Sequence, residues 1–351
     1  MTDTTPRVNR ALRIDHALMR WRARRAREAG LVPSVIPYTG YGSTSWIRVL
    51  GRVVLDRPPL GPSGGPTGAR GWRNFTKVPV ADAEVEVQVG DRTAAVVTAN
   101  ASGIVDAVVA VDLAPGWHEI RLSAEGSSPV SAHVNVIDPD VGFGLVSDID
   151  DTVMVTALPR PLLAAWHTFV VNEHARATTP GMPVLYERLT SQHDGAPVIY
   201  LSTGAWNVAP TLTRFLSRNL YPRGALLLTD WGPTPDRWFR SGQEHKRSSL
   251  ERLAEEFPDI KWLLVGDDGQ HDEAIYGAFV SRHAEKVAAV CIRQLSPGEA
   301  VLAGSSNRAH DVSGLAARVP WLYAPDGAGL AEKLDDTGLL AAPRSQPEVT
   351  A

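Results

Sequence analysis

The chain of 351 residues has a length typical of two domains, and its 44% hydrophobic and 21% charged residues are ordinary for a soluble globular protein. The single cysteine, Cys291, excludes an intramolecular disulfide, and the sequence shows neither the apolar core of a signal peptide at its start nor an uncharged apolar stretch long enough to cross a bilayer. With a formal net charge of −4, this composition fits a protein of the reducing cytoplasm, which is the location we expect.

Residues 1–40 are expected to form a basic, helical N-terminal segment. Residues 1–30 contain eight arginines and three acids, a net of +5, which leaves −9 for the rest of the chain. Near-helical spacing of apolar residues predicts a helix from Ala11 to Ala29. This helix either contacts anionic lipid at a membrane surface or, as its short apolar face favours, docks on the neighbouring domain. A nucleic-acid-binding arm has less support, because the rest of the chain shows no basic groove.

Residues 41–139 predict an antiparallel β-sandwich of Ig-like or transthyretin-like type. A strand-like run from Ser45 to Leu55 precedes a loop rich in proline and glycine. Five segments with period-two alternation follow at short spacing, as is typical of such sandwiches: 83–89, 93–98, 103–111, 116–122 and 131–136. Nothing in them resembles a catalytic constellation. The sandwich could bind a partner, form a wall of an active site or stabilise its neighbour.

Residues 140–340 predict an α/β domain, and residues 341–351 a disordered tail with two prolines. Apolar strands alternate with helical segments, which is typical of a Rossmann-like parallel sheet of about five strands with flanking helices. The expected strands lie at 145–148, 198–202, 225–230, 260–265 and 287–292.

The first of these strands ends in a cluster of acids, Ser-Asp-Ile-Asp-Asp-Thr over residues 147–152. Ligands of open α/β sheets bind at the carboxyl ends of strands, where Asp148 is expected. A carboxylate there can attack phosphorus, and Asp150 can protonate the leaving group and later deprotonate water. A divalent cation would relieve the repulsion between these acids. A calcium loop is a poor alternative, since no glycine follows the acids, and a helix cap needs fewer of them.

Polar residues also end the later strands. Ser202 ends the second strand, Lys246 is expected at the start of a helix after the third, and Gly266 to Asp272 follows the fourth. Each signal is weak alone, because Ser202 could cap a helix, Lys246 could be a solvated surface lysine, and Gly266 to Asp272 could be an ordinary turn. Their order on successive strand ends favours a phosphoryl-transfer site.

These motifs resemble those of the haloacid dehalogenase-like phosphohydrolases: Asp148-x-Asp150-x-Thr152, Ser202, Lys246 and the Gly-Asp-x-x-x-x-Asp form at Gly266 to Asp272. More narrowly, residues 147–152, 200–207 and 266–276 are similar to the actin-patch-protein-type phosphatidate phosphatase catalytic domain, over roughly 141–294. Two departures stand out. Thr203-Gly204-Ala205 replaces a Ser-Pro-like step, and Asp268 stands where a serine is expected.

The resemblance implies a haloacid dehalogenase-like fold with a small cap and a magnesium-dependent phosphatase. Asp148 would form an aspartyl-phosphate, and Asp150 would serve as general acid and base. The Mg²⁺ would be held by Asp148, by the backbone carbonyl of Asp150 and by Asp267. Ser202 and Lys246 would hold the transferring phosphoryl group. Supporting roles are expected for Thr152, which would shape the turn, and for Asp268 and Asp272, which would assist the metal or its waters.

The segments between the motifs offer room for small lids alone, namely 153–197 and the aromatic-rich stretch 231–244. An open site suits a phosphate on a large or membrane-embedded molecule. The resemblance, together with this open site, implies a phosphomonoesterase acting on phosphatidate or a related lipid phosphate, and we expect it in the cytoplasm or peripherally at a membrane. One alternative is a phosphatase for a phosphoprotein, nucleotide or sugar phosphate. Another is a binding or scaffold protein whose phosphatase-like domain is inactive, although five intact site residues argue against it.

Overall fold

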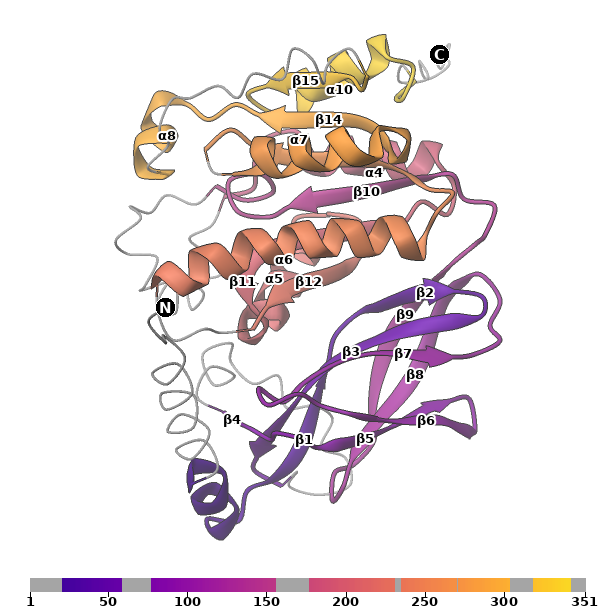
Figure 1. The fold of residues 1–351 in the computed structure, drawn as a ribbon, viewed down its shortest axis with the longest axis vertical. Helices are drawn as coiled ribbons and strands as arrows, with labels where there is room; N and C mark the ends of the chain where they lie inside the picture. The colour runs from indigo at the N-terminus through magenta and orange to yellow at the C-terminus, as the bar shows by residue number, and fades with distance from the viewer. Residues whose placement is uncertain are drawn as a thin grey trace, which may run out of the picture. The chain divides into compact units, whose positions relative to one another are not determined.

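The structure is a computed structural model, and it describes residues 21–58, 77–155, 177–230, 235–269, 271–303 and 318–341. The chain divides into two compact units, of which the first contains residues up to Pro139 with the short segments Gly204–Thr211 and Asp230–Gly232. The second unit holds the remainder. Each unit has its own sheet (Figure 1).

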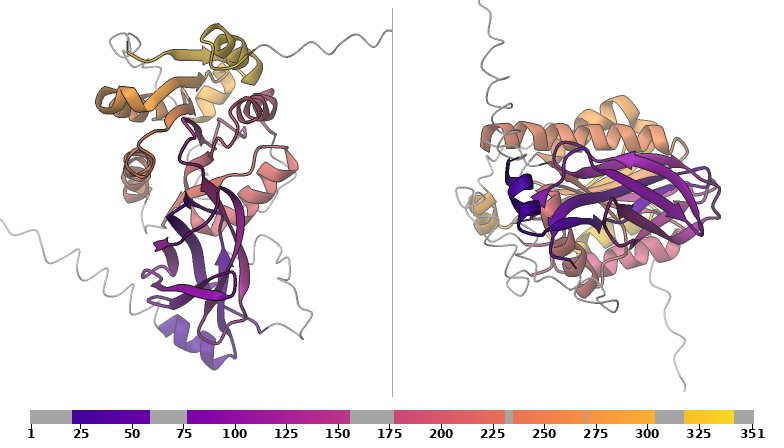
Figure 2. Two further views of the ribbon diagram at one scale, coloured as in Figure 1. Left: turned by 90° about the vertical axis from the view of Figure 1, so that its right-hand side faces the viewer. Right: turned by 90° about the horizontal axis from the view of Figure 1, so that it is seen from below.

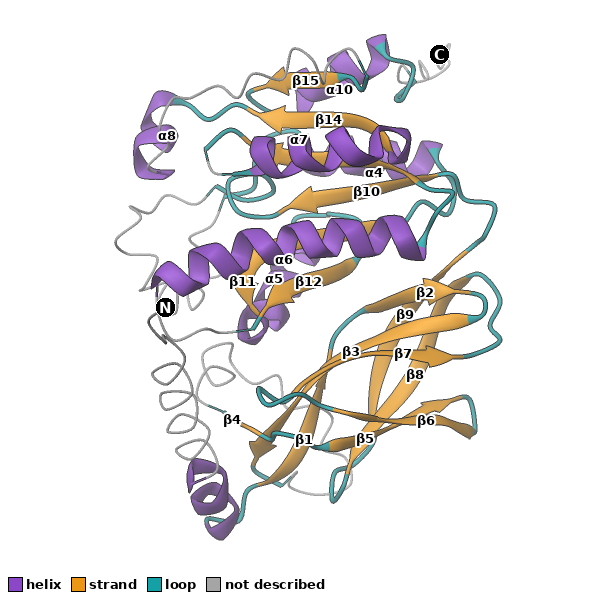
Figure 3. Cartoon of the chain, viewed as in Figure 1, coloured by secondary structure: helices purple, strands orange, loops and turns teal. Residues whose placement is uncertain are grey.

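The first unit is built on a nine-stranded sheet (Figure 3). The strands are β1 (Val32–Pro37), β2 (Gly40–Ser43), β3 (Trp46–Asp56), β4 (Val78–Pro79), β5 (Glu84–Val89), β6 (Arg92–Thr98), β7 (Ile104–Ala110), β8 (Gly116–Ala124) and β9 (Val130–Ile137). The six strand-like segments expected between residues 45 and 136 are strands, whereas β1, β2 and β4 are additional. Most neighbours pair antiparallel, but β2 pairs with β9 in parallel, so the sheet is mixed. The expected antiparallel pairing thus holds for the other described strand pairs of this sheet, and β2 with β9 departs from it.

Strand β1 lies within the segment that was expected to be helical, and it forms one end of the sheet, where it pairs with β3. Its sequence, Val-Pro-Ser-Val-Ile-Pro, joins β-branched residues to two prolines, Pro33 and Pro37, which edge strands tolerate. The described part of the expected N-terminal helix is helical from residue 21 to residue 28. The extension of this helix toward Ala11 lies outside the described residues.

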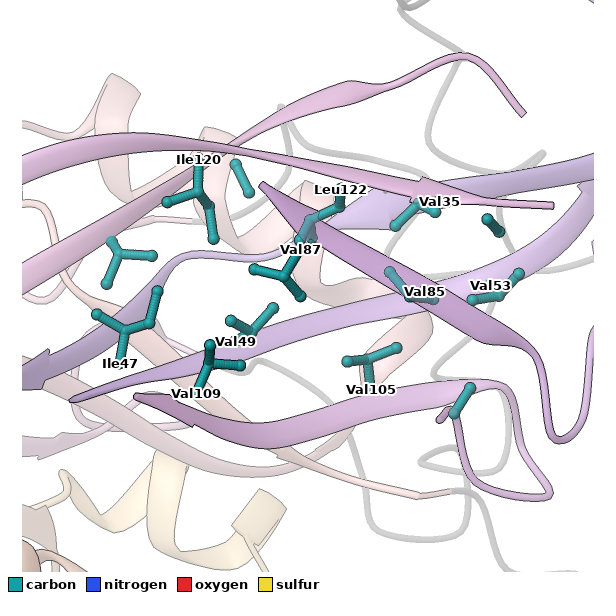
Figure 4. Close-up of a cluster of buried hydrophobic side chains, with 14 of the residues drawn as sticks. Val35, Ile47, Val49, Val53, Val85, Val87, Val105, Val109, Ile120 and Leu122 are labelled. Atoms are coloured by element: carbon teal, nitrogen blue, oxygen red, sulfur yellow. The ribbon is translucent and has the colours of Figure 1, made fainter. Parts of the chain in front are cut away.

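The core of the first unit consists of branched aliphatic side chains that alternate along the strands. Figure 4 shows Val49 and Val53 of β3 with Val105 and Val109 of β7, and the facing side chains come from β5 and β8. Val49, Val53 and Val105 are at most 1% exposed. Burial of a side chain of this size contributes about 1.5–3 kcal/mol, so this cluster stabilises the unit.

The second unit contains a six-stranded sheet in the order β12-β11-β10-β13-β14-β15. Its strands are β10 (Phe143–Asp148), β11 (Val198–Ala205), β12 (Ala225–Thr229), β13 (Lys261–Asp267), β14 (Val287–Arg293) and β15 (Trp321–Ala324). β10 pairs in parallel with β11 and β13, as do β13 with β14 and β14 with β15. The α/β class and the parallel sheet are confirmed, with one more strand, β15, than the five expected.

The order of this sheet reverses at β10. The chain adds β11 and β12 on one side of β10 and then crosses to add β13, β14 and β15 on the other. In open α/β sheets this reversal leaves a crevice at the carboxyl ends of the two central strands, where ligands bind. A ligand site of this sheet is therefore expected at the carboxyl ends of β10 and β13.

Helices connect the strands: α4 (Met182–Gln192), α5 (Ala209–Arg218), α6 (Pro235–Glu256), α7 (Asp272–His283), α8 (Pro297–Ala303) and α10 (Gly327–Asp336), with short turns η3 (Trp206–Val208) and η4 (Ala284–Lys286). α6 and α7 cover one face of the sheet, and α4 and α5 the other (Figures 1 and 2). α6 begins at Pro235 and not at His245 as expected, because proline suits the first turn of a helix. Much of the lid stretch 231–244 is therefore helical.

Among the described residues, no helix combines the length and apolar character needed to span a membrane. Cys291 is buried and free, as the sequence requires. Trp206 of η3 is buried. Outside the described residues lie residues 59–71 of the expected loop, residues 156–176 of the stretch 153–197, the side chains of residues 231–241, and residues 342–351 of the C-terminal tail.

Candidate active site

Three site residues lie at the carboxyl ends of adjacent strands. Asp148 ends β10, Ser202 lies toward the end of β11, and Asp267 ends β13. The register aligns Asp148 with Leu201 on one side and Ser147 with Val265 on the other, which brings the three ends to one edge of the sheet. The apolar strands are buried on both faces, so the first positions at which polar side chains can act are these ends.

Lys246 of α6 joins two of the acids. Its Nζ donates to Asp148 Oδ1 at 2.6 Å and to Asp272 Oδ1 at 2.6 Å. The lysine is 4% exposed, so it is a buried charge and not the solvated surface residue considered as an alternative. A buried ammonium with two carboxylate partners is held in one place, which suits it to act on a bound anion.

Helix α7 brings Asp272 to this edge. Tyr276 of α7 donates to the Val265 carbonyl of β13 at 2.9 Å, which fixes the helix on the strand. Asp272 Oδ2 accepts from the backbone N–H of Asp267 at 3.4 Å. Gly266 permits this approach, because a Cβ there would lie 2.7 Å from both the Cβ and Oδ2 of Asp272.

Asp148, Asp267 and Asp272 form a cluster that could hold a metal ion, with one carboxylate oxygen of each within 4.8 Å of the others. Lys246 compensates one of their three charges, which leaves two negative charges in a buried space. Uncompensated buried charge is costly, and one divalent cation would balance it. The donor set consists of carboxylates, which hard cations prefer.

One oxygen in the cluster is suited to a cation. Asp267 Oδ1 accepts from the Gly269 N–H at 2.7 Å, whereas the buried Oδ2 has no hydrogen-bond partner among the described residues. Both oxygens of Asp272 accept from protein donors. The geometry therefore fits Asp148 and Asp267 as direct ligands of a divalent cation and Asp272 as the acid that fixes Lys246.

The pKa values of these groups reflect the crowding of charge. Burial, together with the charges of Asp272 and Asp150, raises the pKa of Asp148 well above its usual range, although Lys246 opposes this. Burial, Asp272 and Asp148 likewise raise the pKa of Asp267. Burial works against the ammonium of Lys246, but its two carboxylate partners outweigh that effect and raise its pKa. The acids therefore favour a further positive charge, while Lys246 stays protonated.

Asp150 lies in the turn after β10, and its carboxylate is not part of the three-acid cluster. Its Oδ2 accepts from the Ser202 hydroxyl at 3.0 Å. The turn closes through the Ile149 carbonyl, which accepts from the N–H groups of Val153 at 3.0 Å and Met154 at 3.1 Å. Asp150 is only partly exposed, and its Oδ1 is buried, whereas Asp148 is buried as a whole.

The expected supporting residues take different places. The buried Thr152 hydroxyl has no hydrogen-bond partner among the described residues. Asp268 Oδ1 accepts from the Leu295 N–H at 2.8 Å, and this hydrogen bond joins the loop after β13 to the loop after β14. Asp272 alone of the three lies within the acid cluster.

Sequence reasoning missed residues that hold the site. The Ser147 hydroxyl shares a hydrogen bond of 2.5 Å with the Tyr186 hydroxyl of α4. Arg293, at the end of β14, donates to the Asp151 carbonyl at 2.7 Å. The signal for Arg293 was present in the sequence, since it is a charged residue at the carboxyl end of an apolar strand, as Asp148 and Asp267 are.

Comparison with known proteins finds one matching family model over the part of the chain that holds the site. Residues 143–294 match the family model described as "Phosphatidate phosphatase APP1, catalytic domain". Phosphatidate phosphatase APP1 of Saccharomyces cerevisiae is 27% identical over 162 residues, which cover 45% of this chain and 27% of that protein. An uncharacterized protein of Schizosaccharomyces pombe is 26% identical over 165 residues, 47% of this chain and 27% of its own length. The chain thus aligns with 27% of the length of each of these relatives.

Similarity to solved structures is weak. The structure of PhoD covers 74% of this chain and 70% of its own, with 9% identity and a TM-score of 0.30. A glycosyl hydrolase family 2 member from Bacteroides cellulosilyticus covers 84% of this chain and 38% of its own, with 10% identity and a TM-score of 0.23. Likenesses at this level carry no argument about fold or function.

Proposed function

We propose that the chain is a magnesium-dependent phosphatase of the haloacid dehalogenase-like type with a small cap, since residues 143–294 match the phosphatidate phosphatase APP1 catalytic-domain model. The matched segment runs from the start of β10 to the residue after β14 and contains every site residue described above. The observation that carries the proposal is the buried cluster of Asp148, Asp267 and Asp272 with Lys246 at the switch point of the sheet.

The reaction would proceed in two steps. An Asp148 carboxylate oxygen attacks phosphorus, and the bond to the leaving oxygen breaks as that oxygen takes a proton from Asp150. Water then attacks the aspartyl-phosphate and gives its proton to Asp150, which releases phosphate and restores both acids. The 3.0 Å hydrogen bond from Ser202 supports this role for Asp150, because it holds the carboxylate beside the nucleophile.

Lys246 and Ser202 would bind the phosphoryl oxygens once the substrate enters. Lys246 Nζ already lies 2.6 Å from the nucleophile, so a phosphorus bonded to Asp148 would bring its oxygens within reach of the ammonium. Asp148, the backbone carbonyl of Asp150 and Asp267 would hold the Mg²⁺, with Asp272 in support. When bound, this ion neutralises charge on the phosphate oxygens.

Phosphatidate is the substrate that we propose. The family description and the Saccharomyces cerevisiae relative both carry the name phosphatidate phosphatase. The hydrolysis of vesicle-borne phosphatidate should be compared with that of a phosphopeptide, a nucleotide monophosphate and a sugar phosphate, each with Mg²⁺ and each repeated with Asp148→Asn. We expect release of phosphate from phosphatidate by the unmodified chain and none by the variant.

The outcomes separate the alternatives. Preference for a soluble ester would replace the lipid substrate and retain the chemistry. Activity that survives Asp148→Asn would remove the nucleophile. No hydrolysis of any ester, with Mg²⁺ bound, would favour a binding or scaffold protein.

We further propose that the arginine-rich helix of residues 21–28 contacts the anionic membrane that carries the substrate. Ala23 and Ala26 of this helix pack against the sandwich core. The side chains of its four arginines, Arg22, Arg24, Arg25 and Arg27, are not used in that packing and are exposed apart from their contacts within the helix. Trp21 is 49% exposed beside the Arg25 guanidinium, which suits a headgroup region.

Binding to phosphatidate-containing vesicles tests this contact. Replacing Arg22, Arg25 and Arg27 by glutamine should weaken binding about 100-fold at low salt, since each arginine near an anionic surface contributes about 1 kcal/mol. The matched control replaces the exposed Arg57, Arg92 and Arg121 by glutamine, which makes the same change in net charge. Equal weakening by both triple variants would show that overall charge matters and not the helix.

A further inference from the structure

Arg293 is a buried guanidinium outside the acid cluster and is 4% exposed. It ends β14, in register with Asp267 of β13, so its backbone belongs to the same edge of the sheet as the site. A buried arginine is costly unless its donors are paired. Its partners therefore indicate what the residue does.

Each donor group of Arg293 reaches a different segment. Nη1 donates to the Asp151 carbonyl at 2.7 Å, in the turn after β10. Nη2 donates to Glu299 Oε1 at 2.6 Å, in α8, and Nε donates to the Pro325 carbonyl at 3.3 Å, after β15. The Arg293 side chain thus connects the turn that carries Asp150 to α8 and to the residue after β15.

The turn contains a backbone conformation that the hydrogen bond from Arg293 helps to hold. Asp151 has a φ of 58°, in the left-handed region that residues with a side chain rarely adopt. This conformation sets the direction of the Asp151 carbonyl, and the Arg293 Nη1 donor fixes that carbonyl from outside the turn. Since Asp150 immediately precedes Asp151, its backbone is held by the same contact.

We propose that Arg293 is a positioning residue that aligns Asp150 for proton transfer, and that Glu299 orients Arg293. The inference rests on the proposed phosphatase function. It identifies two residues of the second unit, Arg293 and Glu299, that act through the turn without touching the acid cluster in the described contacts. Glu299 Oε2 also accepts from the Ser296 N–H at 2.8 Å, so the carboxylate is itself fixed.

Lysine cannot replace arginine in this role. A guanidinium presents donors in a planar fork that reaches several directions at once, whereas an ammonium is a point charge on a flexible stem. Arg293→Lys keeps the charge and loses the simultaneous contacts. The matched control is Arg282→Lys, because Arg282 is an exposed arginine of α7 that pairs with Glu251.

The leaving group supplies the decisive readout. A misaligned general acid slows the release of an alkoxide, which needs a proton, far more than the release of nitrophenolate, which does not. For Arg293→Lys we expect kcat/KM to fall about 10-fold to 100-fold on dioctanoyl phosphatidate and less than about 3-fold on p-nitrophenyl phosphate. Glu299→Gln should change both values in the same sense but less, and Arg282→Lys should change neither. Equal losses on the two esters, or no loss, would overturn the inference.

Amide hydrogen exchange tests the positioning without relying on turnover. In Arg293→Lys the amides of Val153 and Met154, which close the turn onto Ile149, should exchange about 10-fold faster, while Arg282→Lys leaves them unchanged. An unmodified chain that hydrolyses neither ester would refute the phosphatase function, and faster exchange would still show that Arg293 holds the turn. Unchanged exchange in a folded Arg293→Lys or Glu299→Gln variant would refute the positioning itself.

Discussion

Gly266 and Asp272 are in such close contact that a side chain at position 266 would force a neighbour to move. A Cβ there would lie 2.7 Å from the Asp272 Cβ and 2.8 Å from the Tyr276 ring. Asp272 in turn holds Lys246, which holds Asp148. The glycine before Asp267, the proposed metal ligand of β13, is therefore linked to Asp148, the proposed nucleophile of β10, through two ion pairs.

Gly266→Ala should displace Asp272 and, with it, Lys246. We expect a loss of about 1–3 kcal/mol in the free energy of unfolding, as is usual for overpacking, and a lower kcat. Urea unfolding and phosphatase assays measure the two effects. Gly298→Ala is the control, because a Cβ at Gly298 meets nothing within 4 Å. A Gly266→Ala protein as stable and active as this control would contradict the packing argument.

Removal of the buried Lys246 ammonium should leave the negative charges of the acid cluster uncompensated. Lys246→Met leaves Asp148 and Asp272 without their cation, and losing one partner of a buried pair costs about 3–5 kcal/mol. Unfolding in urea should show this loss in EDTA and a smaller one with Mg²⁺, which replaces part of the missing charge. Lys333→Met, at an exposed position of α10, should change stability by less than about 0.5 kcal/mol. Equal stability of the two variants in EDTA would refute the coupling.

The pH dependence of the metal-free protein follows from Asp267. Burial and neighbouring acids raise the pKa of Asp267 in the folded protein above its pKa in the unfolded chain. Protonation of Asp267 therefore adds to the stability of the fold below the unfolded-state pKa. This contribution is lost as the pH rises through the folded-state pKa. Asp267→Asn removes this loss, and at pH 7 in EDTA it should be more stable by about 1 kcal/mol or more. Denaturant titrations at several pH values measure this. The variant should gain no stability from added Mg²⁺, and a gain equal to that of the unmodified chain would exclude Asp267 as a ligand.

Cys291 should be inert in the folded protein. It is 0% exposed within β14, and burial raises the pKa of its thiol, so little thiolate forms at neutral pH. An aromatic disulfide reagent should react with it slowly in buffer and fully in concentrated urea, with Cys291→Ala as the blank. Rapid labelling in buffer would mean that β14 opens easily.

The sequence was informative where buried strands read as unbroken apolar runs. Ala225–Thr229 and Val287–Arg293 are of this kind, and polar residues at strand ends pointed to the site. β15, Trp321–Ala324, has four residues and is too short to stand out. The parallel pairing of β2 with β9 joins segments far apart in the chain, which no local pattern encodes.

Details of the site also depended on tertiary contacts. Nothing local distinguishes Lys246 from other helical lysines, and its burial follows from the packing of α6 on the sheet. Asp268 and Asp272 looked equivalent in the sequence, yet one ties a loop and the other pairs with the lysine. The hydrogen bond from Arg293 to the Asp151 carbonyl joins residues 142 positions apart in the chain, so no local periodicity or spacing predicts it.

The two prolines of β1 bear on association between molecules. Pro33 and Pro37 are four positions apart on an outermost strand, so both fall in the same row, the one that faces away from β3. Proline has no N–H to offer, so this row lacks two of the donors that a foreign strand would need. The sandwich is thereby protected at this border against edge-to-edge aggregation.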